Sequence, residues 1–182
     1  MDADTKLMIS WHIGDRDAEG GLCLIRDLQD RITNRVQLTT DGHRAYLVAV
    51  EVVFGADVDY AMLVKLYGED KDSERRYSPA VCTASRATPI TGKPDPDHIS
   101  TSYIERQNLT VRMGMRRFTR LTNAFSKKVL NHSCALALHF LYYNFARPHQ
   151  SLKNPYPRTP AMAAGLADHV WTVDEIVGLL SN

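Results

Sequence analysis

Two acidic residues lie where a carboxylate could take part in chemistry. Asp41 directly follows a short apolar stretch with the pattern of a β-strand, and Glu105 lies one turn into a predicted helix. In open α/β sheets ligands gather at the carboxyl ends of strands, and an acidic side chain there can hold a metal ion. Asp41 and Glu105 are therefore the first candidates for a catalytic or metal-binding role.

Both residues also have a structural explanation. The pair Asp41-Gly42 is typical of a turn, which needs only a small acceptor and a flexible glycine. Ser102 and Glu105 have the S-x-x-E spacing of a capping box at the start of a helix. Position alone favours these structural roles over a catalytic one.

A basic segment follows Glu105. It has seven basic residues up to Lys128 against one acidic residue, whereas the rest of the chain has 15 basic and 20 acidic residues. The total net charge of +1 therefore hides a local excess that can hold a polyanion. Arginines beside a metal site would bind DNA phosphates, and a solvated helix face is the alternative. The candidate DNA-binding residues are Arg106, Arg112, Arg116, Arg117, Arg120, Lys127 and Lys128.

Composition and the remaining reactive side chains narrow the class of protein. A chain of 182 residues suits one domain, and its 44% apolar and 24% charged residues exclude a disordered chain and a disulfide-dense module. Cys23 and Cys134 lie in apolar surroundings and are predicted to be small core residues in a reducing cytoplasm. His132 and His139 share a helix face without a third ligand, which predicts satisfied core or groove residues.

The start of the chain and its hydropathy argue against a membrane location. Asp2 and Asp4 follow Met1, so the basic region of a signal peptide is not seen. The most apolar stretch, residues 134–143, is too short to span a bilayer. The prediction is a cytoplasmic protein with no membrane partner.

An alternation of strands and helices must position these residues. A turn over residues 2–5 precedes the first of three predicted strands. The first helix has Asp17 as its N-cap, and the second ends at Gly55. This succession predicts an α/β fold with a sheet covered by helices. The strands are predicted over residues 6–13, 36–40 and 58–66, and the helices between them over 17–32 and 45–54.

The second half of the chain is predicted to be mainly helical. Residues 67–99 are rich in charge, proline and glycine and are predicted to be a long loop of the kind that is functional or mobile. Thr172 and Glu175 have the spacing of a capping box. Helices are predicted over residues 102–115, 126–145 and 172–180, with a short one that starts at Pro160.

Several short motifs, taken in order, resemble those of DDE transposases of bacterial insertion sequences, relatives of the integrases. These motifs are Thr39–His43 (TTDGH), Ser100–Leu109 (STSYIERQNL), Arg116–Arg120 (RRFTR) and Asn144–His149 (NFARPH). Near the start, residues 4–7 and 10–16 resemble the second and third strands of the same fold. The resemblance implies a ribonuclease H-like mixed sheet flanked by helices, without its first strand. It assigns residues 1–165 to the catalytic domain, with 67–99 as an insert loop, and residues 166–182 to a C-terminal helical tail.

The family resemblance also implies an activity. Three carboxylates in that family bind two divalent metal ions, Mg²⁺ or Mn²⁺, and cut and join DNA strands. Asp41 and Glu105 resemble the second and third carboxylates, and the basic residues resemble contacts to DNA. In that family the first catalytic Asp lies on the first strand, upstream of the turn that residues 2–5 of this chain resemble. Asp2 and Asp4 resemble residues of that turn and not the catalytic Asp. We therefore expect an amino-terminally truncated transposase domain with impaired cleavage and strand transfer.

Two alternatives remain open on the sequence. The chain could be an inactive remnant that only binds DNA or full-length transposase, or an unrelated α/β protein in which Asp41 and Glu105 form a turn and a cap. The expected partners are the insertion-sequence ends and target DNA, with a possible homo-oligomer. Because the fold would lack a strand, we also expect an exposed sheet edge or apolar face, and with it marginal solubility.

Overall fold

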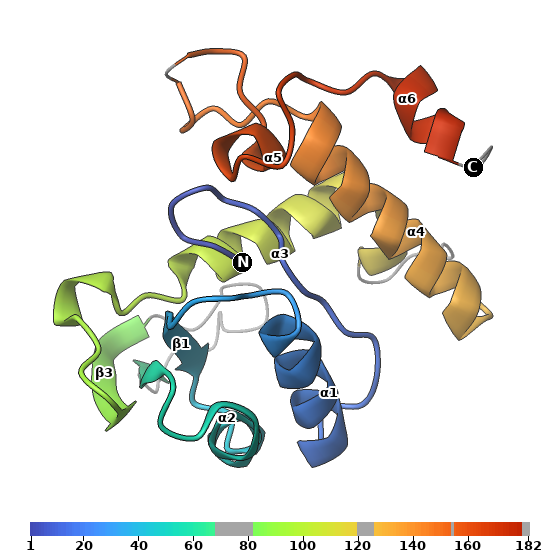
Figure 1. Ribbon diagram of the computed structural model, residues 1–182. Helices are drawn as coiled ribbons and strands as arrows, with labels where there is room; N and C mark the ends of the chain where they lie inside the picture. The colour runs from blue at the N-terminus through green and yellow to red at the C-terminus, as the bar shows by residue number, and fades with distance from the viewer. Residues whose placement is uncertain (68–81, 120–125, 154, 180–182) are drawn as a thin grey trace. The chain divides into compact units, whose positions relative to one another are not determined.

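The computed structural model describes residues 1–67, 82–119, 126–153 and 155–179 (Figure 1). Two compact units make up the chain. Unit 1 consists of Met1–Ile13 and Tyr103–Asn182, and unit 2 consists of Gly14–Ser102. The fold class is α/β, as predicted, with a three-stranded mixed sheet and flanking helices.

The sheet lies in unit 2. Its strands are β1 (Gln37–Asp41), β2 (Asp59–Tyr67) and β3 (Cys82–Thr91), in that order. β1 runs parallel to the central strand β2, and β3 runs antiparallel to it. The predicted strands over 36–40 and 58–66 are therefore confirmed as β1 and β2.

Two helices cover one face of this sheet. Tyr60 and Met62 are two residues apart on β2 and therefore point to the same face of the sheet. There they pack with Ile25 of α1 (Ala18–Gln29) and Val50 of α2 (Ala45–Phe54). Both predicted helix boundaries are confirmed. Asp17 caps α1 by accepting a hydrogen bond from Gly20 N, and α2 ends at Gly55, whose φ of +53° suits glycine.

Unit 1 is helical. Its core joins Val111, Leu136 and Phe140, with Trp11 and Ile13 of the amino-terminal segment packed against them. The long helical stretch predicted to end at residue 145 ends at Ala146, with Arg147 as its C-cap, and the predicted capping box between Thr172 and Glu175 is present. No helix in the described parts of the chain has the length and apolar character needed to cross a membrane. The elements are α3 (Ser102–Gly114), η2 (Arg116–Phe118), α4 (Val129–Leu141), the π-helix η3 (Tyr142–Ala146), α5 (Pro160–Ala163) and α6 (Val173–Gly178).

The predicted first strand is not a strand. Residues 6–13 pair with no strand among the described residues and run as an irregular segment. The side chain of Asn144 takes the place of a neighbouring strand: its Oδ1 accepts from Met8 N and its Nδ2 donates to Met8 O, both at 2.9 Å. Tyr143 Oη adds a bond to Lys6 O at 3.2 Å. The apolar residues of the segment therefore serve helix packing instead of a sheet.

The loop predicted over residues 67–99 contains a strand. β3 pairs with β2 from Cys82 to Thr91, and most of its side chains are exposed. A strand that is exposed on both faces does not require alternating apolar and polar residues. Because that alternation is the pattern by which a strand is recognised in a sequence, β3 is not predicted from the sequence. Pro89 also weakens the strand pattern, although proline is tolerated in edge strands.

The prediction of core cysteines is wrong. Cys23 and Cys134 are both exposed. Gly21 and Ile25 are the buried residues of α1. Cys23 lies midway between them in the sequence and therefore points to the opposite side of the helix. Cys134 likewise lies two residues before the buried Leu136.

Candidate nucleic-acid interface

Charge divides between the two units. Unit 1 has 11 basic and 6 acidic residues, a net charge of +5, and unit 2 has 11 basic and 15 acidic residues, a net charge of −4. The basic region extends well past the predicted segment, because residues 106–167 include ten basic residues and no Asp or Glu. Unit 1 is thus the part of the chain suited to a polyanion.

Helix α3 presents its basic residues to solvent. Gln107 and Val111 are buried, and the opposite side exposes Glu105, Arg106 and Arg112. Glu105 and Arg112 are seven residues apart, two helical turns, and so share a face. Of the basic residues that follow Glu105, Arg112 therefore shares its exposed side of α3.

The remaining predicted basic residues fall between Gly114, the end of α3, and Val129, the start of α4, in the sequence. Arg116, Lys127 and Lys128 are exposed. Arg117 has a structural role, because its Nη1 donates to Ser126 Oγ at 2.7 Å and to Asn131 O at 3.4 Å. Arg120 lies outside the described residues.

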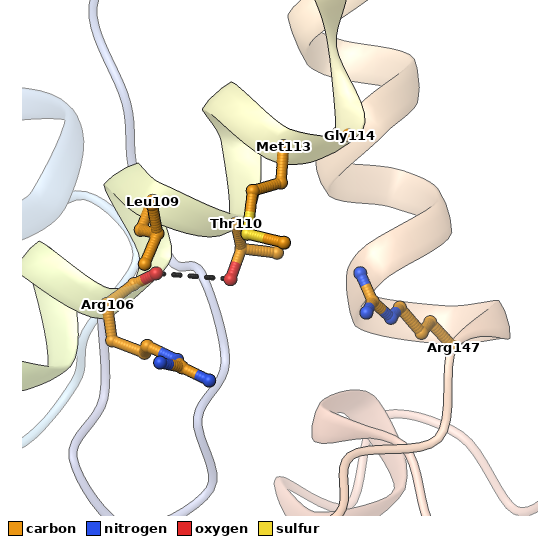
Figure 2. A pocket seen from close by; sticks show the side chains of 6 residues that line it. All are labelled: Arg106, Leu109, Thr110, Met113, Gly114 and Arg147. Atoms are coloured by element: carbon orange, nitrogen blue, oxygen red, sulfur yellow. Dashed lines mark hydrogen bonds between the residues drawn. The ribbon is translucent and has the colours of Figure 1, made fainter.

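A pocket opens beside α3, with a volume of about 260 Å³. Figure 2 shows the side chains of Arg106 and Arg147 on opposite sides of it, with Thr110 between them. Neither guanidinium forms a hydrogen bond or an ion pair with any residue that the structure describes. The lining residues are Arg106, Leu109, Thr110, Met113 and Gly114 of α3, and Arg147, which follows η3.

Arg147 influences the titrating groups around it. Burial and then the charge of Arg147 lower the pKa of His139, and burial, Lys6 and Arg147 together lower the pKa of His149. Burial raises the pKa of Tyr143 to about 12, although Arg147 opposes that rise. The region around Arg147 thus carries a positive potential, which suits an anion.

Sequence prediction missed Arg147 as a candidate. The predicted basic segment stops at Lys128, and 18 residues with no Lys or Arg separate the two positions. The signal that could have found Arg147 is the lack of acidic residues up to Ala167, not the local density of basic ones.

Asp41 lies at the carboxyl end of β1, as predicted, and its side chain is exposed. Its Oδ1 accepts a hydrogen bond from His43 N at 3.1 Å, and its Oδ2 lies 3.4 Å from Arg16 Nη2. The first contact is the turn role that the sequence offered as an alternative. The carboxylate is still open to solvent, so the turn and a ligand role are compatible.

Glu105 lies in the first turn of α3 and is exposed. Because α3 begins at Ser102, this serine is the first helical residue, and its hydroxyl bonds to that of Ser100 at 2.8 Å. Glu105 belongs to unit 1 and Asp41 to unit 2, so neither unit alone contains both carboxylates. Across the described ranges, no three His, Cys, Asp or Glu side chains gather where they could hold a metal ion.

The two helix histidines pack against aromatic rings. The ring of His132 lies 4.6 Å from that of Phe118, and His139 lies 5.5 Å from Phe140, measured between ring centroids. His132 Nδ1 and His139 Nε2 are buried and have no hydrogen-bond partner among the described residues. The predicted place in a core or groove is confirmed, whereas the prediction that both rings are satisfied is wrong.

Protein-family models, curated proteins and solved structures were all compared with this chain, and none of them matches it.

Proposed function

We propose that this chain binds DNA through the phosphate backbone, with the exposed side of α3 and Arg147 as its contact surface. The observation that carries the proposal is the basic surface of unit 1, where the guanidiniums of Arg106 and Arg147 have no partner among the described residues. Arginine is suited to phosphate because its planar group donates several hydrogen bonds in a fixed geometry.

The motif resemblance makes DNA the polyanion of choice. The transposase-like motifs at residues 100–109 and 144–149 coincide with α3 and with the segment that includes Arg147. On this proposal unit 2 is part of a ribonuclease H-like domain, which is consistent with its parallel β1–β2 pair joined through α2. The chain would then act in DNA transposition.

DNA strand cleavage is a second candidate, favoured by two observations. Asp41 is exposed at the end of a parallel strand, and Glu105 shares a helix face with Arg112. The motif resemblance implies Mg²⁺ or Mn²⁺ as the metal ion, with Asp41 of unit 2 and Glu105 of unit 1 as candidate ligands. The described residues do not assemble a three-ligand set, so we derive no cleavage step from them.

The test of DNA binding is a salt series on the full chain with a labelled duplex, followed by fluorescence anisotropy. Each phosphate contact contributes about −0.9 to the slope of log affinity against log salt concentration. We expect Arg112→Gln to weaken binding and to reduce this slope by about 1. Arg86→Gln is the matched control, because Arg86 is exposed on β3 in the acidic unit. Equal effects of the two substitutions would contradict the proposed surface.

A cleavage assay in Mg²⁺ and in Mn²⁺ separates the two candidates. If the chain cleaves DNA, Asp41→Asn and Glu105→Gln should each abolish cleavage and leave the fold intact. Asn keeps the side-chain oxygen that His43 N binds, so the turn survives the change. Salt-sensitive binding without cleavage by the unmodified chain would support a protein that only binds DNA.

A further inference from the structure

We propose that the pocket between Arg106 and Arg147 binds the terminal phosphate of a DNA strand, in preference to the phosphates within it. This inference rests on the proposed DNA binding and adds which part of the DNA the pocket takes. It would make the chain a reader of 5′-phosphorylated DNA ends.

The first argument is charge. The pocket offers two guanidiniums, and the residues described around it supply no carboxylate to either of them. A phosphate within a strand has one negative charge, whereas a terminal phosphomonoester has about −1.5 to −2 at neutral pH. Two facing cations therefore match a terminal phosphate better than an internal one.

The second argument is the supply of hydrogen-bond donors. Thr110 Oγ1 lies 3.1 Å from Arg106 O, to which it donates its only proton. The hydroxyl is thus not a donor toward a ligand. The guanidiniums of Arg106 and Arg147 are the donors that the pocket offers, and both are suited to bind two oxygens of the same phosphate.

The third argument is size and the apolar wall. A volume of about 260 Å³ is just below the roughly 300–1,000 Å³ of drug-sized ligand sites, so the pocket suits a small group such as one nucleotide. Leu109 and Met113 line it and are 43% and 80% exposed. The sugar and base that carry the terminal phosphate would cover this apolar surface.

The fourth argument is the surrounding potential. Lys6 and Arg147 both lower the pKa of His149, so their positive charges act on the same region. No Asp or Glu occurs in the sequence from Arg106 to Ala167. Glu105 precedes Arg106 on α3 but does not line the pocket, so the charged residues that line it are both basic and would attract an anion.

The experiment compares two duplexes that differ only in a single 5′ group, a phosphate or a hydroxyl, by anisotropy on the full chain. We expect the phosphorylated duplex to bind about tenfold more tightly, and Arg106→Gln or Arg147→Gln to bring the ratio close to one. Both arginines are exposed, so circular dichroism should show that the variants are folded. Arg112→Gln is the control: it lies on α3 outside the pocket and should weaken both duplexes equally.

The outcomes separate this inference from the proposed function. Equal affinity of the unmodified chain for both duplexes, still sensitive to salt and to Arg112→Gln, would overturn the inference and leave DNA binding standing. No salt-sensitive binding to either duplex would overturn both. Competition by a free deoxynucleoside 5′-monophosphate as effective as the phosphorylated end would assign the pocket to free nucleotides and overturn its role at DNA ends.

Discussion

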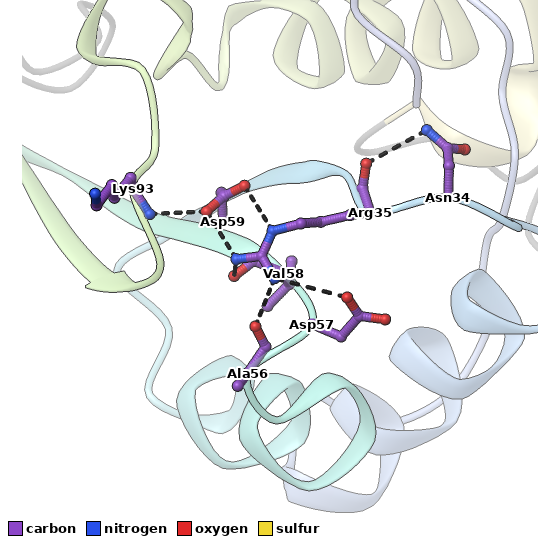
Figure 3. A network of polar contacts seen from close by, with 7 residues as sticks. All are labelled: Asn34, Arg35, Ala56, Asp57, Val58, Asp59 and Lys93. Carbon is purple, nitrogen blue, oxygen red and sulfur yellow. Dashed lines mark hydrogen bonds and ion pairs between the residues drawn. The ribbon is translucent and has the colours of Figure 1, made fainter.

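Arg35 and Asp59 form a two-point ion pair beside the start of the parallel strands β1 and β2 (Figure 3). The Nε and Nη2 atoms of Arg35 donate to the two carboxylate oxygens of Asp59 at 3.0 and 2.9 Å. The same guanidinium donates to the carbonyl oxygens of Ala56 and Val58. Arg35 thereby ties the segment before β1 to the turn before β2, and this helps to set the register that places Asp41.

Because of the Arg35–Asp59 ion pair, the stability of the fold should depend on pH in the acidic range. The Arg35 guanidinium, with a bond from Lys93 N, lowers the pKa of Asp59 from 3.8 to about 2. A carboxylate with a lowered pKa stabilises the fold above pH 3.8, and this stabilisation is lost as the pH falls toward 2. Arg35→Leu should therefore lower the melting temperature at pH 7. The difference in melting temperature between this variant and the unmodified chain should shrink as the pH falls from 3.8 toward 2.

Thermal unfolding followed by circular dichroism measures this difference. Arg31→Leu is the control, because Arg31 pairs with Asp27 on the exposed surface of α1 and such pairs contribute little. A constant difference from pH 7 down to pH 2 would show that Arg35 acts through packing and not through its charge.

Gly92 is required by the same network. Its φ is +69°, and a Cβ atom there would collide with the carboxylate of Asp59 and lie 2.7 Å from Arg35 Nη2. Gly92→Ala should cost about 1–3 kcal/mol for the backbone conformation alone, and more because the ion pair must shift. Gly165→Ala is a matched control, because Gly165 has a φ of +74° with no atom within 4 Å of an added Cβ. Equal losses in chemical denaturation would contradict a role for the collision.

Loss of the Asn144 side-chain amide should lower the free energy of unfolding substantially. Its side chain makes two hydrogen bonds to Met8 and is 9% exposed. Asn144→Leu keeps the size of the side chain but leaves Met8 N and O without partners, which should cost about 1–3 kcal/mol. Urea denaturation measures the loss, with the exposed Asn131→Leu as control. A loss no larger than that of the control would mean that water replaces the amide.

How far the sequence predicts this fold depends on where each signal lies. Asp17 and Gly55 mark helix ends through local chemistry, so those boundaries could be placed correctly. The path of residues 6–13 depends on Asn144, more than a hundred residues away, and no local pattern contains that contact. β3 is exposed on most of its length, so the apolar alternation that marks a strand is missing.

The candidate site divides in the same way. The exposed arginines of α3 follow from charge density and helical spacing, both of which can be read locally. Arg147 joins Arg106 only through the packing of unit 1, and a single basic residue far from the segment gives no local signal. The roles of Asp41 and Glu105 remain predictions, because they belong to separate units.

Burial of His139 should make the stability of the fold depend on pH near neutrality. Burial, and then the charge of Arg147, lowers its pKa below 6.5, so the folded chain resists a proton that the unfolded chain accepts. The free energy of unfolding should therefore fall as the pH drops below about 6.5. His139→Leu should remove this part of the pH dependence in denaturant titrations at pH 7.5 and pH 5.5, conditions chosen on either side of roughly the ordinary histidine pKa. The exposed His12→Leu should leave it in place.

The order of the two units along the chain has a consequence for biosynthesis. Unit 2 is continuous, so all of its contacts can form once Ser102 has left the ribosome. Unit 1 is not, because the bonds between Met8 and Asn144 span 136 residues. Its amino-terminal segment must wait, apolar and unpaired, while the whole of unit 2 is made. During translation unit 2 can therefore fold first, whereas the packing of unit 1 is completed only after Asn144 has been made.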